Sequence, residues 1–196
     1  MSRELGHNKV LVVVIYVPKN NGLAKFTDRV RQLVKDPQFE PVRGEDISLL
    51  VDRTLGFFGW TGNDLFEDYC ASGKGKYLRV LEFMAWPEIV KPSLCLLGPE
   101  QLKISDYSVL LRSGKIKIAV PSKYQNLARK YFELQKWSPE IIVLGGELEK
   151  QIRLGVADLV LDIVQSGQSA QRERLCTYQT IFSREKAGLV LITKDI

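Results

Sequence analysis

The residues best suited to chemistry lie in one stretch, where a polar turn follows an apolar run. The run covers residues 156–164 and is rich in β-branched residues, which predicts a buried strand. Residues 165–169 form the turn, and residues 170–174 are good helix formers with Ser169 placed to cap them. The start of such a helix offers unpaired backbone N–H groups and the positive end of its dipole to an anion. The spacing therefore predicts an anion site at this turn, formed by Ser166, Gly167, Gln168 and Ser169.

Two carboxylates, Asp158 and Asp162, interrupt the apolar run. They are four residues apart, so on a strand they should face the same side. A carboxylate beside a phosphate site is suited to accept hydrogen bonds from sugar hydroxyls or to hold a metal ion. Together the turn and the carboxylates indicate a ribose phosphate. The alternative is an ordinary strand–turn–helix corner with a capping serine, because glycine turns are common at strand ends.

This stretch resembles the phosphoribosyl-pyrophosphate (PRPP) signature of the ATP phosphoribosyltransferase family, the first enzyme of histidine biosynthesis. The matching residues are Glu149, Gly155, Ala157, Val160, Asp162, Ile163, Ser166, Gly167 and Ser169. The family usually has threonine in place of Ser169, and leucine or methionine in place of Ala170. The resemblance implies that Asp162 is catalytic and that Mg²⁺ arrives with PRPP. It also implies a PRPP site formed by Glu149, Asp158, Asp162, Ser166, Gly167, Gln168 and Ser169.

The first half of the chain resembles the same family at three further places. Pro18, Lys19 and Leu23 follow its Pro-Lys-Gly-Arg-Leu opening, with one residue inserted and the arginine missing. Its Arg-Pro-x-Asp and Gly-x-x-Gly-Lys-Asp elements are matched by Arg43, Asp46, Gly59, Gly62 and Asp64, with Asn63 replacing the lysine. The resemblance implies an ATP and phosphate site that contains Lys19, Arg43, Thr61, Asn63 and Asp64. On the residues alone, Lys19 could equally be a solvated loop lysine, and Asp64 could cap a helix.

Composition excludes several kinds of chemistry. The chain has 196 residues, 45% of them hydrophobic and 26% charged, as in an ordinary soluble protein of one large or two small domains. The single histidine, His7, argues against catalytic triads and histidine metal clusters, and three scattered cysteines argue against a disulfide framework or a zinc site. The net charge of +5 is dispersed, which argues against nucleic-acid binding. No apolar run spans a membrane and no signal peptide is visible, so we expect a cytoplasmic protein.

Strands alternating with helices predict parallel sheets with right-handed crossovers. Strands are expected at 10–17, 39–42, 55–58, 78–83, 93–97, 116–120, 141–144, 156–164, 177–182 and 188–193. Helices are expected at 23–35, from 47, from 65, after the cap Ser122, at 147–154 and at 170–174. The family resemblance implies an α/β fold of the two-lobed, periplasmic-binding-protein-like (type II) kind, with mainly parallel sheets. The last strand should return to the first half. The first lobe (ATP side) would be residues 1–112 plus 183–196, and the second (PRPP side) residues 113–182.

The resemblance implies that N1 of ATP attacks C1 of PRPP and releases pyrophosphate. The chain ends at Ile196, too soon for the family's regulatory domain or its usual last helix, so we expect the short form of the enzyme. That form implies a homodimer and a partner that resembles histidyl-tRNA synthetase. The alternative is a catalytically impaired PRPP- or nucleotide-binding paralogue, because the missing loop arginine and Asn63 each remove a cation. A third, weaker alternative is a solute-binding protein.

Overall fold

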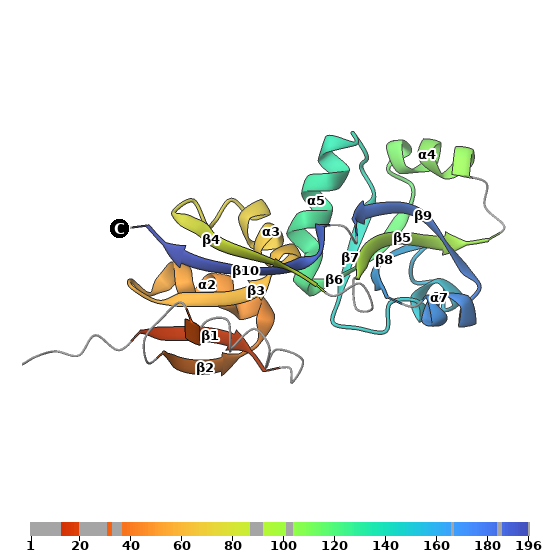
Figure 1. Ribbon diagram of the computed structural model, residues 1–196. Coiled ribbons are helices and arrows are strands. Elements are labelled where there is room, and N and C mark those ends of the chain that lie inside the picture. Colours follow the sequence, from red (N-terminus) through yellow and green to blue (C-terminus); the bar gives the residue numbers. More distant parts are fainter. Residues whose placement is uncertain are drawn as a thin grey trace, which may run out of the picture.

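The computed structural model describes residues 13–19, 31–32, 37–86, 92–100, 104–165, 167–183 and 186–195. The described chain forms two five-stranded sheets, each flanked by helices, and the sheets lie side by side as two lobes (Figure 1). Most of the helix expected at 23–35 falls outside the described residues, as does the His7 leader. No helix in the described part of the chain has the length and apolar character that crossing a membrane requires.

The first sheet has the strand order β2-β1-β3-β10-β4. Its strands are β1 (Val14–Pro18), β2 (Gln38–Val42), β3 (Phe58–Gly62), β4 (Leu78–Ala85) and β10 (Gly188–Lys194). The helices that accompany it are η2 (Gly44–Asp46), α2 (Ile47–Arg53) and α3 (Asn63–Ala71). Buried residues of α2 pack with β1 and β10 in one apolar cluster, namely Tyr16, Ile47, Val51, Val190 and Ile192.

The second sheet has the order β7-β6-β8-β5-β9. Its strands are β5 (Ser93–Pro99), β6 (Lys117–Pro121), β7 (Glu140–Leu144), β8 (Leu159–Val164) and β9 (Leu175–Phe182). The helices are α4 (Ile104–Ser113), η4 (Ser122–Tyr124), α5 (Gln125–Leu134), α6 (Lys150–Arg153) and α7 (Gln168–Arg172). Phe132 of α5 is buried against β5, β6 and β8 in the largest core of the molecule.

The two sheets are built alike. In each, three neighbouring strands are parallel, and one strand, β10 or β5, is antiparallel to both of its neighbours. Four strands of each sheet therefore run in one direction. This confirms the predicted α/β fold with mainly parallel sheets. It also confirms the return of the last strand to the first half, because β10 pairs with β3 and β4.

The lobe boundary differs from the expected one. Residues 93–99 were expected in the first lobe, but they form β5, which lies between β8 and β9 of the second sheet. The chain therefore crosses between lobes after β4 and again between β9 and β10. The two crossings are joined by a backbone hydrogen bond of 3.0 Å from Trp86 N–H to the Ala187 carbonyl. Periodicity could not reveal the boundary, because β5 precedes its sheet partners in sequence.

The strand expected at 55–58 begins at its last residue and continues to Gly62. The sequence Gly59-Trp60-Thr61-Gly62 is thus part of the strand and not of the connection that was expected between the strand and the helix at Leu65. Gly59 has a packing role instead, since a Cβ there would lie 2.5 Å from Ile47 and 2.8 Å from Val51. Only glycine lets α2 pack directly on β3 at this point. The helix α3 then starts at Asn63 and not at Leu65.

Candidate functional site

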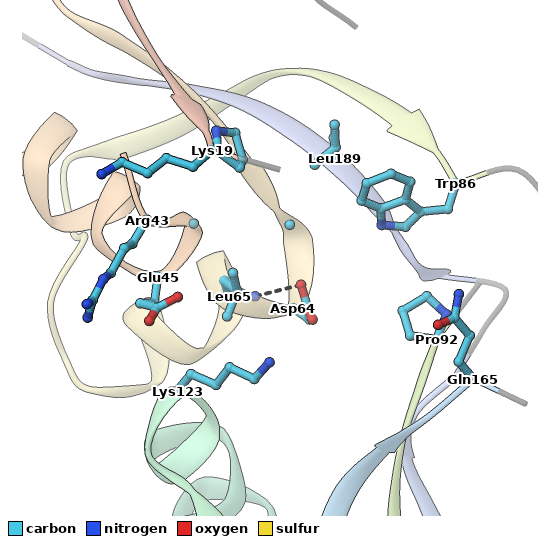
Figure 2. A pocket seen from close by; sticks show the side chains of 13 residues that line it. Lys19, Arg43, Glu45, Asp64, Leu65, Trp86, Pro92, Lys123, Gln165 and Leu189 are labelled. Carbon is cyan, nitrogen blue, oxygen red and sulfur yellow. Dashed lines mark hydrogen bonds between the residues drawn. The ribbon is translucent and has the colours of Figure 1, made fainter. Parts of the chain in front are cut away.

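A cleft of about 410 Å³ opens between the lobes (Figure 2). It is lined by Pro18, Lys19, Arg43, Gly44, Glu45, Gly62, Asp64, Leu65, Trp86, Pro92, Lys123, Gln165 and Leu189. Most of these residues lie at or just after the carboxyl ends of β1, β2, β3, β4, β6 and β8, whereas Pro92 directly precedes β5 and Leu189 lies at the start of β10. The carboxyl ends of parallel strands are where open α/β sheets bind ligands. The cleft is therefore the expected place for a binding site in this fold.

One part of the cleft is cationic. Lys19 and Arg43 are exposed there from the first lobe, and Lys123 of η4 contributes a third cation from the second. Glu45 and Asp64 are the acidic residues that line it. Because an anion binds where cations outnumber carboxylates in a partly desolvated cleft, this part suits a polyphosphate. The predicted residues Lys19, Arg43 and Asp64 are thus brought together.

The opposite part of the cleft is apolar. Figure 2 shows Trp86 and Pro92 on the far side from Lys19 and Arg43, with Gln165 next to Pro92. An indole beside a proline ring offers a flat apolar surface on which a purine base can stack. The cleft thus has a cationic part and an aromatic part, which matches the two halves of a nucleotide.

Gln165 also lines a second cavity, of about 230 Å³, at the predicted phosphate turn. This cavity is lined by Leu97, Glu149, Ile163, Val164, Gln165, Gly167, Gln168, Ser169 and Ala170. Ser166 lies outside the described residues. The shared Gln165 means that the turn cavity adjoins the aromatic part of the cleft.

Gly167 gives the turn its shape. It has φ 75° and ψ 0°, a left-handed conformation that strains any other residue, and it stands at the N-cap of α7. A Cβ at Gly167 would meet no atom within 4 Å, so the backbone faces open space. The predicted cap was wrong: α7 starts at Gln168, and no side chain of the described residues caps it, Ser169 included. The helix start is therefore open to an external acceptor.

Asp162 and Glu149 form a carboxyl pair in the second lobe. Glu149 lines the turn cavity, whereas Asp162 is half-buried beside it and lines neither cavity. The pKa of Asp162 is raised to about 6. Burial is the largest cause, the charge of Glu149 and a hydrogen bond with it act in the same direction, and the N–H of Ile163 and the charge of Lys123 act against them. Two adjacent carboxyls that hold a proton between them can accept hydrogen bonds from ribose hydroxyls once ionised.

Three of the predicted site residues are used elsewhere in the fold. Asp158 lies before β8, at the opposite end from the turn, and accepts a 2.7 Å hydrogen bond from Lys117 N–H. Thr61 is fully buried and donates to the Gly44 carbonyl at 3.0 Å. Asn63 donates to the Lys186 carbonyl at 2.5 Å and accepts from Gly188 N–H at 3.0 Å. We therefore correct these assignments: Asp158, Thr61 and Asn63 stabilise strand ends and a crossing.

Asp64 accepts hydrogen bonds both from its own helix and from the other lobe. Its Oδ2 accepts a 2.5 Å hydrogen bond from the Tyr124 hydroxyl, and its Oδ1 accepts from Leu65 N–H at 2.9 Å (Figure 2). One turn further along α3, the buried Asp68 caps α5 of the second lobe. Ser122 was the expected cap, but it begins the short helix η4 and makes no capping bond to α5.

Sequence reasoning missed Lys123, Trp86 and Asp68. Lys123 could have been found, because it follows the expected strand 116–120 closely and so lies at the edge of the sheet where ligands bind. Trp86 carries no local signal, since it lies in a crossing between lobes. Asp68 reads as an ordinary helical acid, because its partners are 58 and 59 residues away.

The described residues contain no group of three or more His, Cys, Asp or Glu side chains placed to hold a metal ion. The oxygen donors of Glu149 and Asp162 nevertheless fit Mg²⁺, which proteins commonly bind through one or two carboxylates together with substrate phosphates. This donor set suits an ion that arrives with its phosphate ligand.

Comparison with known proteins agrees with this geometry. Residues 43–194 match the family model of HisG, described as ATP phosphoribosyltransferase. The chain is 27% identical over 145 residues to the ATP phosphoribosyltransferase of Hydrogenobaculum sp., covering 74% of this chain and 65% of that relative. It is 32% identical over 149 residues to that of Methanopyrus kandleri, covering 75% of this chain and 48% of that relative. The matches thus span between about half and two thirds of these relatives.

Solved structures confirm the predicted fold. The ATP phosphoribosyl transferase (HisG:HisZ) complex from Thermotoga maritima aligns with a TM-score of 0.71 at 20% identity, covering 93% of this chain and 88% of that chain. A structure of Tv2483 bound to L-arginine aligns at 0.58 and 13% identity, covering 94% and 78%, which agrees with a two-lobed periplasmic-binding-protein-like fold. With most of its length matched by the family model, the chain belongs to the ATP phosphoribosyltransferase family.

Proposed function

We propose that the chain is a catalytic ATP phosphoribosyltransferase, which transfers the phosphoribosyl group of PRPP to N1 of ATP and releases pyrophosphate. The observation that carries the proposal is that two cavities share Gln165: the cleft that holds Lys19, Arg43 and Trp86, and the cavity at the Gly167 turn. Family membership supports the same reaction.

The order of groups along the cleft suits that reaction. The 5′-phosphate of PRPP binds the open start of α7, and the ribose hydroxyls bind Glu149 and Asp162. The adenine stacks on Trp86, and the triphosphate extends toward Lys19 and Arg43. Because Gln165 joins the two cavities, this arrangement brings the base to the ribose, where the new bond between N1 and C1 forms.

The chain's own residues act mainly by position and charge. As the N1–C1 bond forms, the bond from C1 to pyrophosphate breaks and negative charge grows on the leaving group. Lys123 lies in the cleft near enough to Asp162 to lower its pKa, so its cation stands between the ribose site and the polyphosphate site. Electrostatic stabilisation of this kind, together with orientation, needs no further acid or base.

We propose that Mg²⁺ enters as part of the PRPP complex, where it neutralises charge on the pyrophosphate. Glu149 and Asp162 are the residues of this chain that would hold it, through their oxygens. Their contribution is to keep the ribose oriented and the ion near it once Asp162 is ionised.

The test is calorimetry with PRPP–Mg²⁺ and with ATP separately, followed by an assay of pyrophosphate release. We expect both ligands to bind and pyrophosphate to appear only when both are present. The variant Trp86→Leu should weaken ATP binding without affecting that of PRPP, and Trp137→Leu is its control, because Trp137 packs on Tyr131 and Phe132 of α5. Absence of binding by either substrate would reject the proposal.

A second candidate is a catalytically impaired paralogue that binds PRPP or a nucleotide. The observation that favours it is the use of Asn63, which stands where the family has a lysine and which bonds Lys186 and Gly188. A charge-assisted contact contributes about 1.5–3 kcal/mol, so the loss of one slows catalysis by about one to two orders of magnitude. Binding of both substrates without release of pyrophosphate would support this candidate.

The partners follow from the same proposal. We propose that ATP and PRPP are the substrates, that the chain forms a homodimer, and that it works in the cytoplasm without nucleic acid or membrane as partner. The solved HisG:HisZ complex supports a regulatory subunit of the histidyl-tRNA-synthetase-like kind. Co-purification from the native cell, followed by turnover assays with and without the partner, tests this dependence. Full turnover by the lone chain would reject it.

A further inference from the structure

We propose that Asp64 and Asp68 of α3 form a permanent joint between the lobes. The joint keeps the lobes as close as ligand binding requires even when no ligand is bound. It also positions Lys123 inside the cleft. The two carboxylates are four residues apart and lie on one face of the helix. Both accept hydrogen bonds from the start of the other lobe's α5 region. The effect on Lys123 rests on the proposed function, whereas the joint itself does not.

Asp68 is the stronger half of the joint. Its side chain is buried, with 7% of the residue exposed. Its Oδ1 accepts the backbone N–H groups of Asn126 at 2.9 Å and Leu127 at 2.7 Å, and its Oδ2 accepts Asn126 Nδ2 at 2.9 Å. A helix normally satisfies its first N–H groups with its own capping side chain. Here no side chain in the described part of the second lobe caps α5, and the first lobe supplies the acceptor.

Asp64 contacts the same segment one turn earlier. The Tyr124 hydroxyl donates to it, and Tyr124 itself is 3% exposed within the core of the second lobe. Burial and the neighbouring Asp64 charge raise the pKa of Tyr124, so its hydroxyl stays protonated as a donor. Leu65, between the two aspartates, packs against that same core. Polar and apolar contacts therefore hold the lobes together at one place.

Opening the lobes at α3 would break these contacts together. It would expose Asp68 and leave two backbone N–H groups of α5 without their acceptor. In a two-lobed fold that closes on its ligand, part of the binding free energy is used for closure. A joint that already holds the lobes closed removes this cost, so affinity for a ligand that spans the cleft depends on it.

The segment that the joint fixes carries Lys123. This lysine lies directly before Tyr124 and three residues before Asn126, so the bonds at those residues set its place. Figure 2 shows its side chain beside Asp64 and Leu65, inside the cleft. Asp64 and Asp68 are therefore positioning residues, which act on the substrates through Lys123 and through the width of the cleft.

The experiment compares Asp68→Ala and Tyr124→Phe with the control Glu133→Ala, which removes an exposed carboxylate from the same helix α5. Hydrogen exchange reports on the amides of Asn126 and Leu127, and small-angle scattering of the free protein reports on its radius of gyration. Affinities for ATP, which spans the cleft, and for inorganic phosphate, which needs only the turn, complete the set.

We expect Asp68→Ala to exchange these two amides at least about ten-fold faster, to enlarge the free protein, and to weaken ATP binding about ten-fold while phosphate binding stays unchanged. Tyr124→Phe, which keeps the cap, should show the same pattern at about a third of the size and serves if Asp68→Ala does not fold. Wild-type exchange and dimensions in both variants would overturn the joint, as would an open wild-type protein without ligand. If wild type binds neither ATP nor phosphate, the proposed function fails, while exchange and scattering still decide on the joint.

Discussion

The two strand-to-helix junctions after β3 and after β8 occupy the same position in their sheets, yet they do opposite things. At the β3–α3 junction every polar side chain from Thr61 to Asp64 bonds another part of the chain. At the β8–α7 junction the turn lies around Gly167, and no side chain of the described residues caps the helix. Both junctions border a cavity, but at the first the polar side chains are used within the fold, whereas at the second the helix start carries no side-chain cap. A helix start is thus a binding site only where the fold leaves its N–H groups unused.

The largest effect should come from a substitution that blocks the β8–α7 junction. Gly167→Val places a β-branched residue at φ 75° and puts side-chain atoms where a phosphate must approach the backbone. We expect PRPP affinity to fall at least about a hundred-fold, or ~2.7 kcal/mol. Calorimetry measures the change. The control is Gly155→Val, which introduces a similar strain at φ 69° away from both cavities, and equal losses in the two variants would reject the turn as a phosphate site.

A substitution at the β3–α3 junction should lower the stability of the protein and leave its affinity for PRPP unchanged. Asn63→Ala removes two hydrogen bonds to the second crossing, one of which is buried. We expect the free energy of unfolding to fall by about 2–3 kcal/mol, because buried backbone groups lose their partners. Urea denaturation gives this value, and PRPP affinity should stay within about two-fold of wild type. A stable variant that loses substrate binding would instead return Asn63 to the ligand site.

Titration of Asp162, which lies near the β8–α7 junction, should be visible between pH 5 and 7. The pKa of Asp162 is raised from 3.8 to about 6, so the folded protein binds this proton more tightly than the unfolded chain. The contribution of Asp162 to stability is therefore fully present below pH 3.8 and is lost as pH rises through about 6. Substrate binding has the opposite dependence, because ribose and Mg²⁺ need the ionised form.

We expect PRPP–Mg²⁺ affinity to fall about ten-fold between pH 7 and pH 5, which corresponds to the loss of one ionised carboxyl with a pKa near 6. Calorimetry at each pH, corrected for the protonation of PRPP itself, measures this. In Asp162→Asn the slope should disappear while the affinity at pH 7 falls. An unchanged slope in that variant would assign the titration to another group.

The smallest effect should come from Ser122→Ala. A serine before a helix usually contributes about 1 kcal/mol as its N-cap, but here Asp68 caps α5. We expect the free energy of unfolding to change by less than about 0.5 kcal/mol in urea. A loss near 1 kcal/mol would mean that Ser122 shares the capping role in solution.

The β8–α7 junction could be predicted from the sequence because all of the features that indicate it are local. The apolar run, the turn and the position of Gly167 follow one another within a dozen residues. The role of Asn63 at the β3–α3 junction was predicted wrongly because its partners are distant in sequence. Asn63 bonds backbone groups 123 and 125 residues away. Asp158 was misplaced for a related reason, since its bond to Lys117 fixes it at the far end of β8.

The predicted lobe boundary was wrong because of the strand order of the second sheet. Strand β5 runs antiparallel between partners that come much later in sequence, so neither its composition nor its neighbours in the chain assign it to the second sheet. The hydrophobic pattern predicted the α/β class, because that class depends on the alternation of strands and helices along the chain. The return of β10 to the first sheet was implied by the family resemblance. Contacts between lobes depend on how the lobes meet.

The place of β10 in the first sheet has a consequence for synthesis on the ribosome. This strand lies between β3 and β4, but residues 188–194 are made after every strand of the second sheet. The strands of the second sheet are complete at Phe182, whereas the first sheet must wait for β10, which joins β3 to β4. Domains usually fold in the order in which they emerge. Here the lobe that starts first should finish last, and a nascent chain released at residue 187 should have a folded second lobe and an unfolded first one.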